Sequence, residues 1–168
     1  MTALKIKKLN KGFTLIELLV VIGILAILLA ITLIAINPAR QFQQARNTQR
    51  SSDVNSILNA VSQYIVDQGN SIDTIIPAAC TSAAPCNVSQ SGVTDAFCTE
   101  LAPKYIAALP SDPQTNGGSA VLPASCAPAT AWNTGYTIYR GANSRITVSA
   151  PKTEPFTAAT TDDITVTR

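Results

Sequence analysis

The stretch Lys11-Gly12-Phe13-Thr14-Leu15-Ile16-Glu17 stands directly before Leu18 to Ile36, an apolar run that contains no charged residue. At about 1.5 Å per residue, a helix of this length matches the roughly 30 Å hydrocarbon layer of a bilayer. The run therefore predicts a membrane-spanning helix. An acid just inside the start of such a span needs a partner, because an ionisable side chain at membrane depth is costly. We expect Glu17 to require a cation.

The order of the N-terminal features differs from that of an ordinary secretory signal. Such a signal places basic residues first, an apolar stretch second and small residues at the cleavage site last. Here a glycine, Gly12, precedes the apolar run, and so do four lysines: Lys5, Lys7, Lys8 and Lys11. Cleavage after Gly12 would therefore leave the apolar helix on the protein.

This order and the residues Gly12-Phe13-Thr14-Leu15-Ile16-Glu17 resemble the prepilin signature of type IV pilins and of the pseudopilins of type II secretion and DNA uptake. The resemblance implies that a membrane-embedded prepilin peptidase cuts between Gly12 and Phe13 and then methylates the amino group of Phe13. The leader would be residues 1–12, and the transmembrane and assembly helix residues 13–36. The implied partners are the peptidase, identical or related pilin subunits in a helical filament, an inner-membrane assembly platform and membrane lipid.

Cleavage would also supply the missing partner of Glu17. The new amino group on Phe13 is a cation four residues before the acid and at the same end of the span. The alternative is a plain signal anchor in which Glu17 lies at the membrane interface, either snorkelling or protonated. That alternative explains neither the Gly12-Phe13 junction nor the spacing of the acid.

The formal net charge of +2 includes the leader. Twelve Lys and Arg stand against ten Asp and Glu, and removal of the four leader lysines leaves eight against ten, or −2. Neither balance suggests a nucleic-acid binder, so no nucleic acid is expected as a partner. Because basic flanks stay in the cytoplasm, we expect a single-pass inner-membrane protein with residues 69–168 outside. By the resemblance, these residues later lie on an extracellular or periplasmic filament.

Beyond the apolar run the pattern changes to that of an amphipathic helix. Pro38 removes a backbone donor and should kink or locally open the helix. One long helix is predicted from about Phe13 to Gln68, with residues 37–68 as its amphipathic continuation and Gly69-Asn70 as its cap. The residues that step at three and four to form its apolar face are Val54, Ile57, Leu58, Val61, Tyr64 and Ile65.

Three arginines follow the apolar run: Arg40, Arg46 and Arg50. Anionic lipid, a neighbouring subunit or DNA are conceivable contacts for them. A solvated face next to the membrane is the interpretation that we favour.

Residues 69–168 are expected to form a head made of loops and a small sheet. A region rich in Ser, Thr, Ala, Pro, Gly and Asn extends to about residue 134 and predicts loops, with one short helix at Asp95–Leu101 that Thr94 caps. In three later stretches, apolar and polar residues alternate with a period of two. These stretches predict an antiparallel sheet, with a turn at residues 141–144. They are Tyr136–Arg140, Arg145–Ser149 and Ile164–Thr167. One face of this sheet can pack on the helix, which makes the fold class α+β.

All four cysteines fall in the expected head: Cys80, Cys86, Cys98 and Cys126. An even count in an exported segment favours two disulfides, and the three possible pairings are not separated by the sequence. We favour Cys80 with Cys86 and Cys98 with Cys126. A structural zinc site is the alternative, but the close Cys-x-x-Cys pairs that are typical of such sites are missing.

The segment Leu109-Pro110-Ser111-Asp112-Pro113 resembles the Leu-Pro-x-Asp-Pro segment of many pseudopilins, where the nearby loop can bind calcium. Calcium takes six to eight oxygen ligands, and no second carboxylate follows Asp112 closely. We therefore expect a plain turn here and no metal or cofactor, with a calcium site as the alternative. The chain contains no histidine, phosphate-binding glycine loop or nucleophile motif, so we do not expect an enzyme.

Two function classes fit these observations. The first is a structural subunit of a type IV pilus-like filament, for which we favour a type II secretion pseudopilin, with a DNA-uptake pseudopilin as a variant. The second is a monomeric membrane-anchored module that binds a ligand outside the cell membrane. A cleavable leader and an acid at the fifth mature position favour the first class, because a simple tether needs neither.

Overall fold

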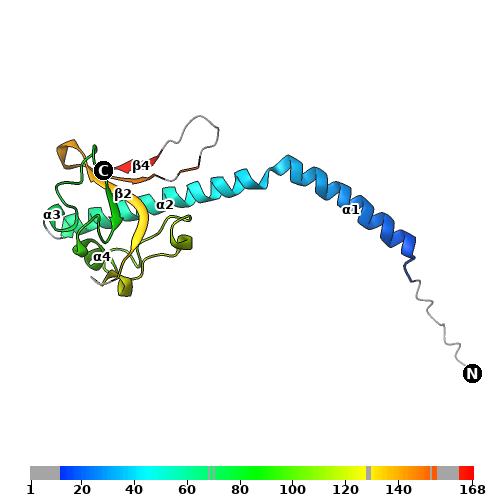
Figure 1. The fold of residues 1–168 in the computed structure, drawn as a ribbon, viewed down its shortest axis with the longest axis horizontal. Helices are drawn as coiled ribbons and strands as arrows, with labels where there is room; N and C mark the ends of the chain where they lie inside the picture. The colour runs from blue at the N-terminus through cyan, green and yellow to red at the C-terminus, as the bar shows by residue number, and fades with distance from the viewer. Residues whose placement is uncertain (1–11, 68, 70, 128–129, 152, 155–162) are drawn as a thin grey trace, which may run out of the picture. The chain divides into compact units, whose positions relative to one another are not determined.

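The computed structural model describes residues 12–168 except 68, 70, 128–129, 152 and 155–162. The chain divides into an N-terminal unit that ends at Ala39 and a C-terminal unit, Arg40–Arg168. The first unit contains helix α1, and the second contains most of helix α2 and the head (Figure 1).

Two helices, α1 (Leu15–Ile36) and α2 (Pro38–Asp67), replace the single helix that the sequence predicts. Asn37 between them leaves the helical region, with φ 44° and ψ 77°. A proline disfavours helical geometry in the residue before it, and asparagine tolerates the left-handed region better than most residues do. The expectation that Pro38 opens the helix is therefore confirmed, and that of continuity from Phe13 is wrong. The expected end at Gln68 lies outside the described residues.

Helix α2 supplies one wall of the hydrophobic core. Its buried residues include five of the six that the spacing selects, and Ile65 is partly buried against the same core. Gly69, directly after residue 68, has a φ of 67°, which suits a glycine that closes a helix. The amphipathic face predicted for this part of the chain is confirmed, and the buried residues of α2 are Arg50, Val54, Ile57, Leu58, Ala60, Val61 and Tyr64.

A four-stranded antiparallel sheet in the order β1-β2-β3-β4 supplies the opposite wall. Strands β2 (Asn133–Arg140), β3 (Ile146–Ala150) and β4 (Ile164–Thr167) are the three that alternation predicts, with small shifts at their ends. Ile138 pairs with Val148, and Val148 pairs with Val166. These three residues lie on the core side of the sheet, together with Tyr136 and Ile146. The expected α+β class is the observed one.

Strand β1 (Cys86–Ser89) is the element that sequence patterning misses. It pairs with β2 through Cys86 opposite Ile138 and Asn87 opposite Thr137. Four residues with one large aliphatic side chain carry little periodic signal, and their strand conformation comes from the neighbouring strand. The predicted three-stranded sheet is therefore corrected to four strands.

The segment between α2 and β2 contains short helices: α3 (Ile72–Ile75), α4 (Asp95–Leu101) and the 3-10 turns η1 (Asn116–Gly118) and η2 (Pro123–Cys126). A third such turn, η3 (Ala142–Ser144), connects β2 to β3 where a turn is predicted. Helix α4 has the predicted bounds and Thr94 is its N-cap residue, but the Thr94 side chain makes no capping hydrogen bond to the helix. Its hydroxyl donates instead to the carbonyl oxygens of Thr74 and Ile75, at 2.6 and 3.0 Å, which ties α4 to α3.

Two disulfides hold these short elements to the core. Cys80 is bonded to Cys86, and Cys98 is bonded to Cys126. This is the pairing that we favour from the sequence. The first bond anchors the start of β1, and the second joins α4 to η2, so both act on segments with little regular structure of their own.

Candidate processing and assembly site

The N-terminal end of α1 is a complete capping box formed by Thr14 and Glu17. The amide of Thr14 donates to Oε2 of Glu17 at 2.9 Å, and the hydroxyl of Thr14 donates to the same oxygen at 2.7 Å. In return, the amide of Glu17 donates to Oγ1 of Thr14 at 3.3 Å. These bonds satisfy backbone donors that the first turn of any helix leaves open. They fix the start of α1 at Leu15.

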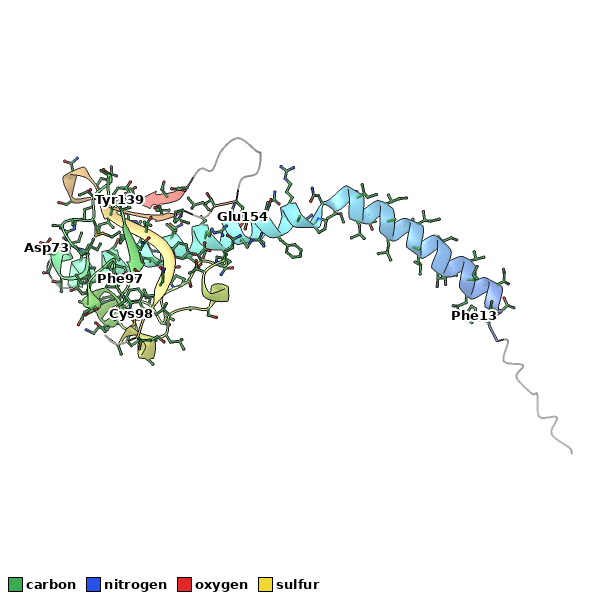
Figure 2. The ribbon with its side chains drawn as sticks, viewed as in Figure 1. Phe13, Asp73, Phe97, Cys98, Tyr139 and Glu154 are labelled. Atoms are coloured by element: carbon green, nitrogen blue, oxygen red, sulfur yellow. A yellow bond between two sulfur atoms is a disulfide. The ribbon has the colours of Figure 1, made fainter. Side chains whose placement is uncertain are left out.

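The Gly12-Phe13 junction lies just before this helix start. Phe13 has 89% of its surface exposed, and Figure 2 shows it at the N-terminal end of α1. A Cβ placed on Gly12 would have no heavy atom within 4 Å. Both residues are outside the helix and open to a partner molecule.

Glu17 has polar partners without any amino-terminal cation. Within the described residues, its carboxylate accepts two hydrogen bonds, both from Thr14. Sequence reasoning considered only a cation and missed the cap, although Thr14-x-x-Glu17 has the spacing of a capping box. One carboxylate oxygen, Oε2, receives both bonds from Thr14. An amine on Phe13 after cleavage would therefore compete with, or add to, an existing arrangement.

Helix α1 is apolar on every side, and no residue of it is buried. Among the described residues it is the one helix with the length and composition to cross a membrane. A signal sequence or a buried core helix also meets those two criteria, but a buried helix would have partners within the chain. An apolar surface of this kind requires lipid or another protein around it.

The prediction that the three arginines form a solvated face is wrong for Arg50. Its side chain has 0% of its surface exposed, and its Nε donates to Oδ2 of Asp112 at 2.6 Å. Nη1 of the same guanidinium donates to Asn47 at 2.9 Å. Asp112 is the acid of the segment that we expected to be a plain turn, and its side chain is 1% exposed. The helix and the Leu109–Pro113 segment are therefore joined by a buried ion pair.

Glu154 connects the segment after β3 to the same part of α2 (Figure 2). Arg46 binds both of its carboxylate oxygens at 2.6 Å, and Gln114 donates to Oε1 at 2.6 Å. The side chain of Asn47 donates to the carbonyl of Glu154 at 2.8 Å and accepts from its amide at 3.1 Å. The Arg46 guanidinium holds the pKa of the Glu154 carboxyl below its usual value. Arg46 therefore anchors the segment after β3 to α2, although its side chain remains 35% exposed.

The same helix face carries one more polar contact. The hydroxyl of Tyr136 donates to Oδ2 of Asp53 at 2.7 Å. Burial raises the pKa of the Asp53 carboxyl and also the pKa of the Tyr136 phenol. This bond joins β2 to α2, beside the Arg50–Asp112 pair.

The described part of the chain contains no cluster of side chains that could bind a metal ion. There, no group of three or more His, Cys, Asp or Glu side chains lies close enough to hold an ion. The carboxylate of Asp112 accepts hydrogen bonds from Arg50 and from the amide of Gln114, at 2.8 Å in the second case. These protein donors use the oxygens that a calcium ion would need.

Comparison with known proteins bears on the N-terminal part of the chain. Residues 7–33 match the family described as the prokaryotic N-terminal methylation motif, a match that spans the Gly12-Phe13 junction and most of α1. No curated protein and no solved structure matches the chain. The motif implies processing by prepilin peptidase, and with α1 it indicates membrane anchoring. The chain thus carries the N-terminal methylation motif that is the signature of type IV pilin and pseudopilin precursors.

Proposed function

We propose that the chain is a structural subunit of a type IV pilus-like filament. In this proposal prepilin peptidase removes residues 1–12, methylates Phe13 and leaves α1 as the assembly helix. The observation that carries the proposal is the methylation motif placed directly on a helix that is apolar on all sides and has no buried residue. Such a helix is suited first to lipid and then to the core of a filament, where copies of itself replace the lipid.

Residues 69–168 would form the head outside the cytoplasmic membrane. The four cysteines support this placement, because disulfides persist in oxidising compartments. Repeated head-to-tail contacts that do not close into a ring would build the filament on an inner-membrane assembly platform. Identical or related subunits are the proposed partners in the filament.

Among filament types we favour a type II secretion pseudopilin, because Leu109–Pro113 resembles a pseudopilin segment. Deletion of the gene in the native host separates the possibilities. Loss of protein secretion supports this choice. Loss of DNA uptake or of surface pili would move the subunit to one of those systems.

Processing tests the proposal directly. The variant Gly12→Val should keep its leader, because a branched side chain obstructs a peptidase that must approach the backbone closely. Gly23→Val is a matched control: it is the same change inside α1, where the new Cβ meets no side chain or distant backbone within 4 Å. Mass spectrometry of membrane-extracted protein should find methylated Phe13 at the amino terminus of wild type and of Gly23→Val.

A wild-type chain that begins at Met1 or Thr2 in its native host would contradict the proposal. It would favour the second function class, a monomeric anchored module whose head binds a ligand, since a tether requires no cleavage.

A further inference from the structure

Thr14 stands between the cleavage junction and α1. Its backbone is extended, with φ −79° and ψ 151°, and the first helical residue follows it. Three hydrogen bonds with Glu17, at 2.7 to 3.3 Å, hold it in this position. The helix start is therefore set one residue after Phe13 by specific side-chain contacts.

We propose that the Thr14–Glu17 capping box keeps the Gly12–Phe13 peptide bond outside the helix, where prepilin peptidase can reach it. Thr14 is then a positioning residue for leader removal. This inference rests on the proposed function, because it assumes cleavage at that bond. It adds a requirement beyond the methylation motif. The junction must contain a glycine, and its backbone must also be kept extended.

The competing conformation is a helix that begins earlier in the chain than α1 does. Asn10 is the next residue before Thr14 whose side chain can cap a helix. A helix that began after Asn10 would include Lys11, Gly12 and Phe13 in its first turn. The carbonyl of Gly12 would then accept a helical hydrogen bond from the amide of residue 16. The atoms of that helical turn would surround the Gly12 carbonyl.

Cleavage requires free access to that carbonyl. Water adds across the Gly12–Phe13 bond: the Gly12 carbonyl carbon gains the hydroxyl and becomes the carboxylate of the leader, while the Phe13 nitrogen gains a proton and becomes the new amine. When opening is fast relative to cleavage, the rate of proteolysis follows the population of the open form. The capping box raises that population by making Thr14 the favoured helix start.

Rates of leader removal test the proposal in the full-length precursor, with purified prepilin peptidase in lipid vesicles. Thr14→Val keeps the side-chain shape and loses the hydroxyl, and should slow cleavage about three- to tenfold, the range expected from loss of an N-cap. Thr14→Ser keeps the hydroxyl and should restore the wild-type rate. Thr32→Val is the control, since Thr32 lies in the same helix and its hydroxyl only donates to the Leu29 carbonyl, at 2.9 Å.

Glu17 variants separate the cap from the charge. Glu17→Gln retains a side-chain oxygen that can accept from Thr14, so it should be cleaved at nearly the wild-type rate. Glu17→Ala retains only the bond from its amide to Thr14 and should be cleaved more slowly, though to completion. Slow cleavage of Glu17→Gln would mean that charge and not capping matters, and would overturn the proposal.

A second measurement reads the conformation itself. Backbone chemical shifts of Phe13 and Thr14, in the full-length precursor in detergent micelles, should be extended in wild type and in Thr14→Ser, and helical in Thr14→Val. Slow cleavage of Thr14→Val with extended shifts would show that Thr14 contacts the peptidase directly, which contradicts a positioning role. Cleavage of Thr14→Val at the wild-type rate would also overturn the inference, while cleavage of wild type after Gly12 would leave the proposed function standing.

Discussion

At position 50 the fold buries a guanidinium completely, and the carboxylate of Asp112 balances its charge. Arg50→Met should lower the free energy of unfolding by about 3 to 5 kcal/mol, because Asp112 stays buried without its cation. Urea unfolding of the full-length protein in detergent can be followed by the fluorescence of Trp132, the single tryptophan, which is 6% exposed. Arg145→Met, the same change at an exposed arginine, should stay within about 0.5 kcal/mol of wild type.

The double variant Arg50→Met, Asp112→Leu checks the cause. Replacement of a whole buried pair by apolar residues is far less costly than removal of one partner. We therefore expect the double variant to regain part of the loss. If Arg50→Met alone unfolds at the wild-type urea concentration, the pair does not hold the Leu109–Pro113 segment to α2.

Glu154 should make the stability of the head depend on pH in the acid range. Its folded pKa is lowered below the usual 4.5, chiefly by the hydrogen bonds from Arg46. The unfolded chain therefore takes up this proton at a higher pH than the folded chain does. The contribution of Glu154 is complete above its usual pKa and is lost as the pH falls through the lowered, folded pKa.

Urea midpoints measured from about pH 7 to about pH 3 test this expectation. Glu154→Gln should be less stable than wild type at neutral pH and should lose less on acidification. Arg46→Gln should make this loss smaller, because without the cation the folded pKa of Glu154 lies closer to its unfolded value. Wild type and Glu154→Gln with parallel pH profiles would show that the Glu154 contacts do not stabilise the head.

At the scale of elements, the two disulfides hold segments that have little regular structure. Each should contribute on the order of 2 to 4 kcal/mol to the stability of the head. The Cys98–Cys126 bond spans 28 residues and the Cys80–Cys86 bond spans 6. Because the chain-entropy gain grows with loop length, removal of Cys98–Cys126 by paired alanine substitutions should cost about 1 kcal/mol more than removal of Cys80–Cys86.

Alkylation and urea unfolding measure both parts of this prediction. Protein from the native cell envelope should accept no alkylating reagent before reduction. Four thiols that label freely would contradict the two bonds. An equal loss of stability in the two paired variants would mean that chain entropy is not the main contribution.

At the scale of the whole molecule, Glu17 is expected to act after processing. Its carboxylate can pair with the Phe13 amine of its own chain or of a neighbour, and the second pairing would set the axial register of a filament. Glu17→Ala should still insert and lose its leader, yet incorporate poorly into filaments, because the amine is left without a partner in apolar surroundings. Glu100→Ala, which removes an acid from the surface of the head, should assemble normally.

Immunoblots of sheared filaments and of the membrane pool, from cells that make only the variant, give the answer. A membrane pool that grows while filaments disappear is the expected result. A normal yield of filaments from Glu17→Ala would show that the acid does not set the register and would favour the plain anchor.

The features that the sequence determined are those whose signal lies within a few neighbouring residues. Local spacing determines the apolar run of α1, the apolar face from Val54 to Tyr64, the bounds of α4 and the pattern of β2 to β4. The methylation motif over residues 7–33 is local as well, because it is a short continuous stretch of chain. Thr14 and Glu17 were within reach of the same reasoning, since their spacing is that of a capping box.

Only the tertiary structure decided which charges are buried and which chain segments they join. Arg50 and Asp112 are 62 residues apart, and Arg46 and Glu154 are 108 apart, so no local pattern relates them. An arginine beside a predicted span looks solvated until another segment of the chain covers it. Strand β1 shows the same limit, because its conformation depends on pairing with β2. Hydrophobic periodicity reports the face that a helix or strand buries, whereas the partner of a charge depends on how distant segments pack together.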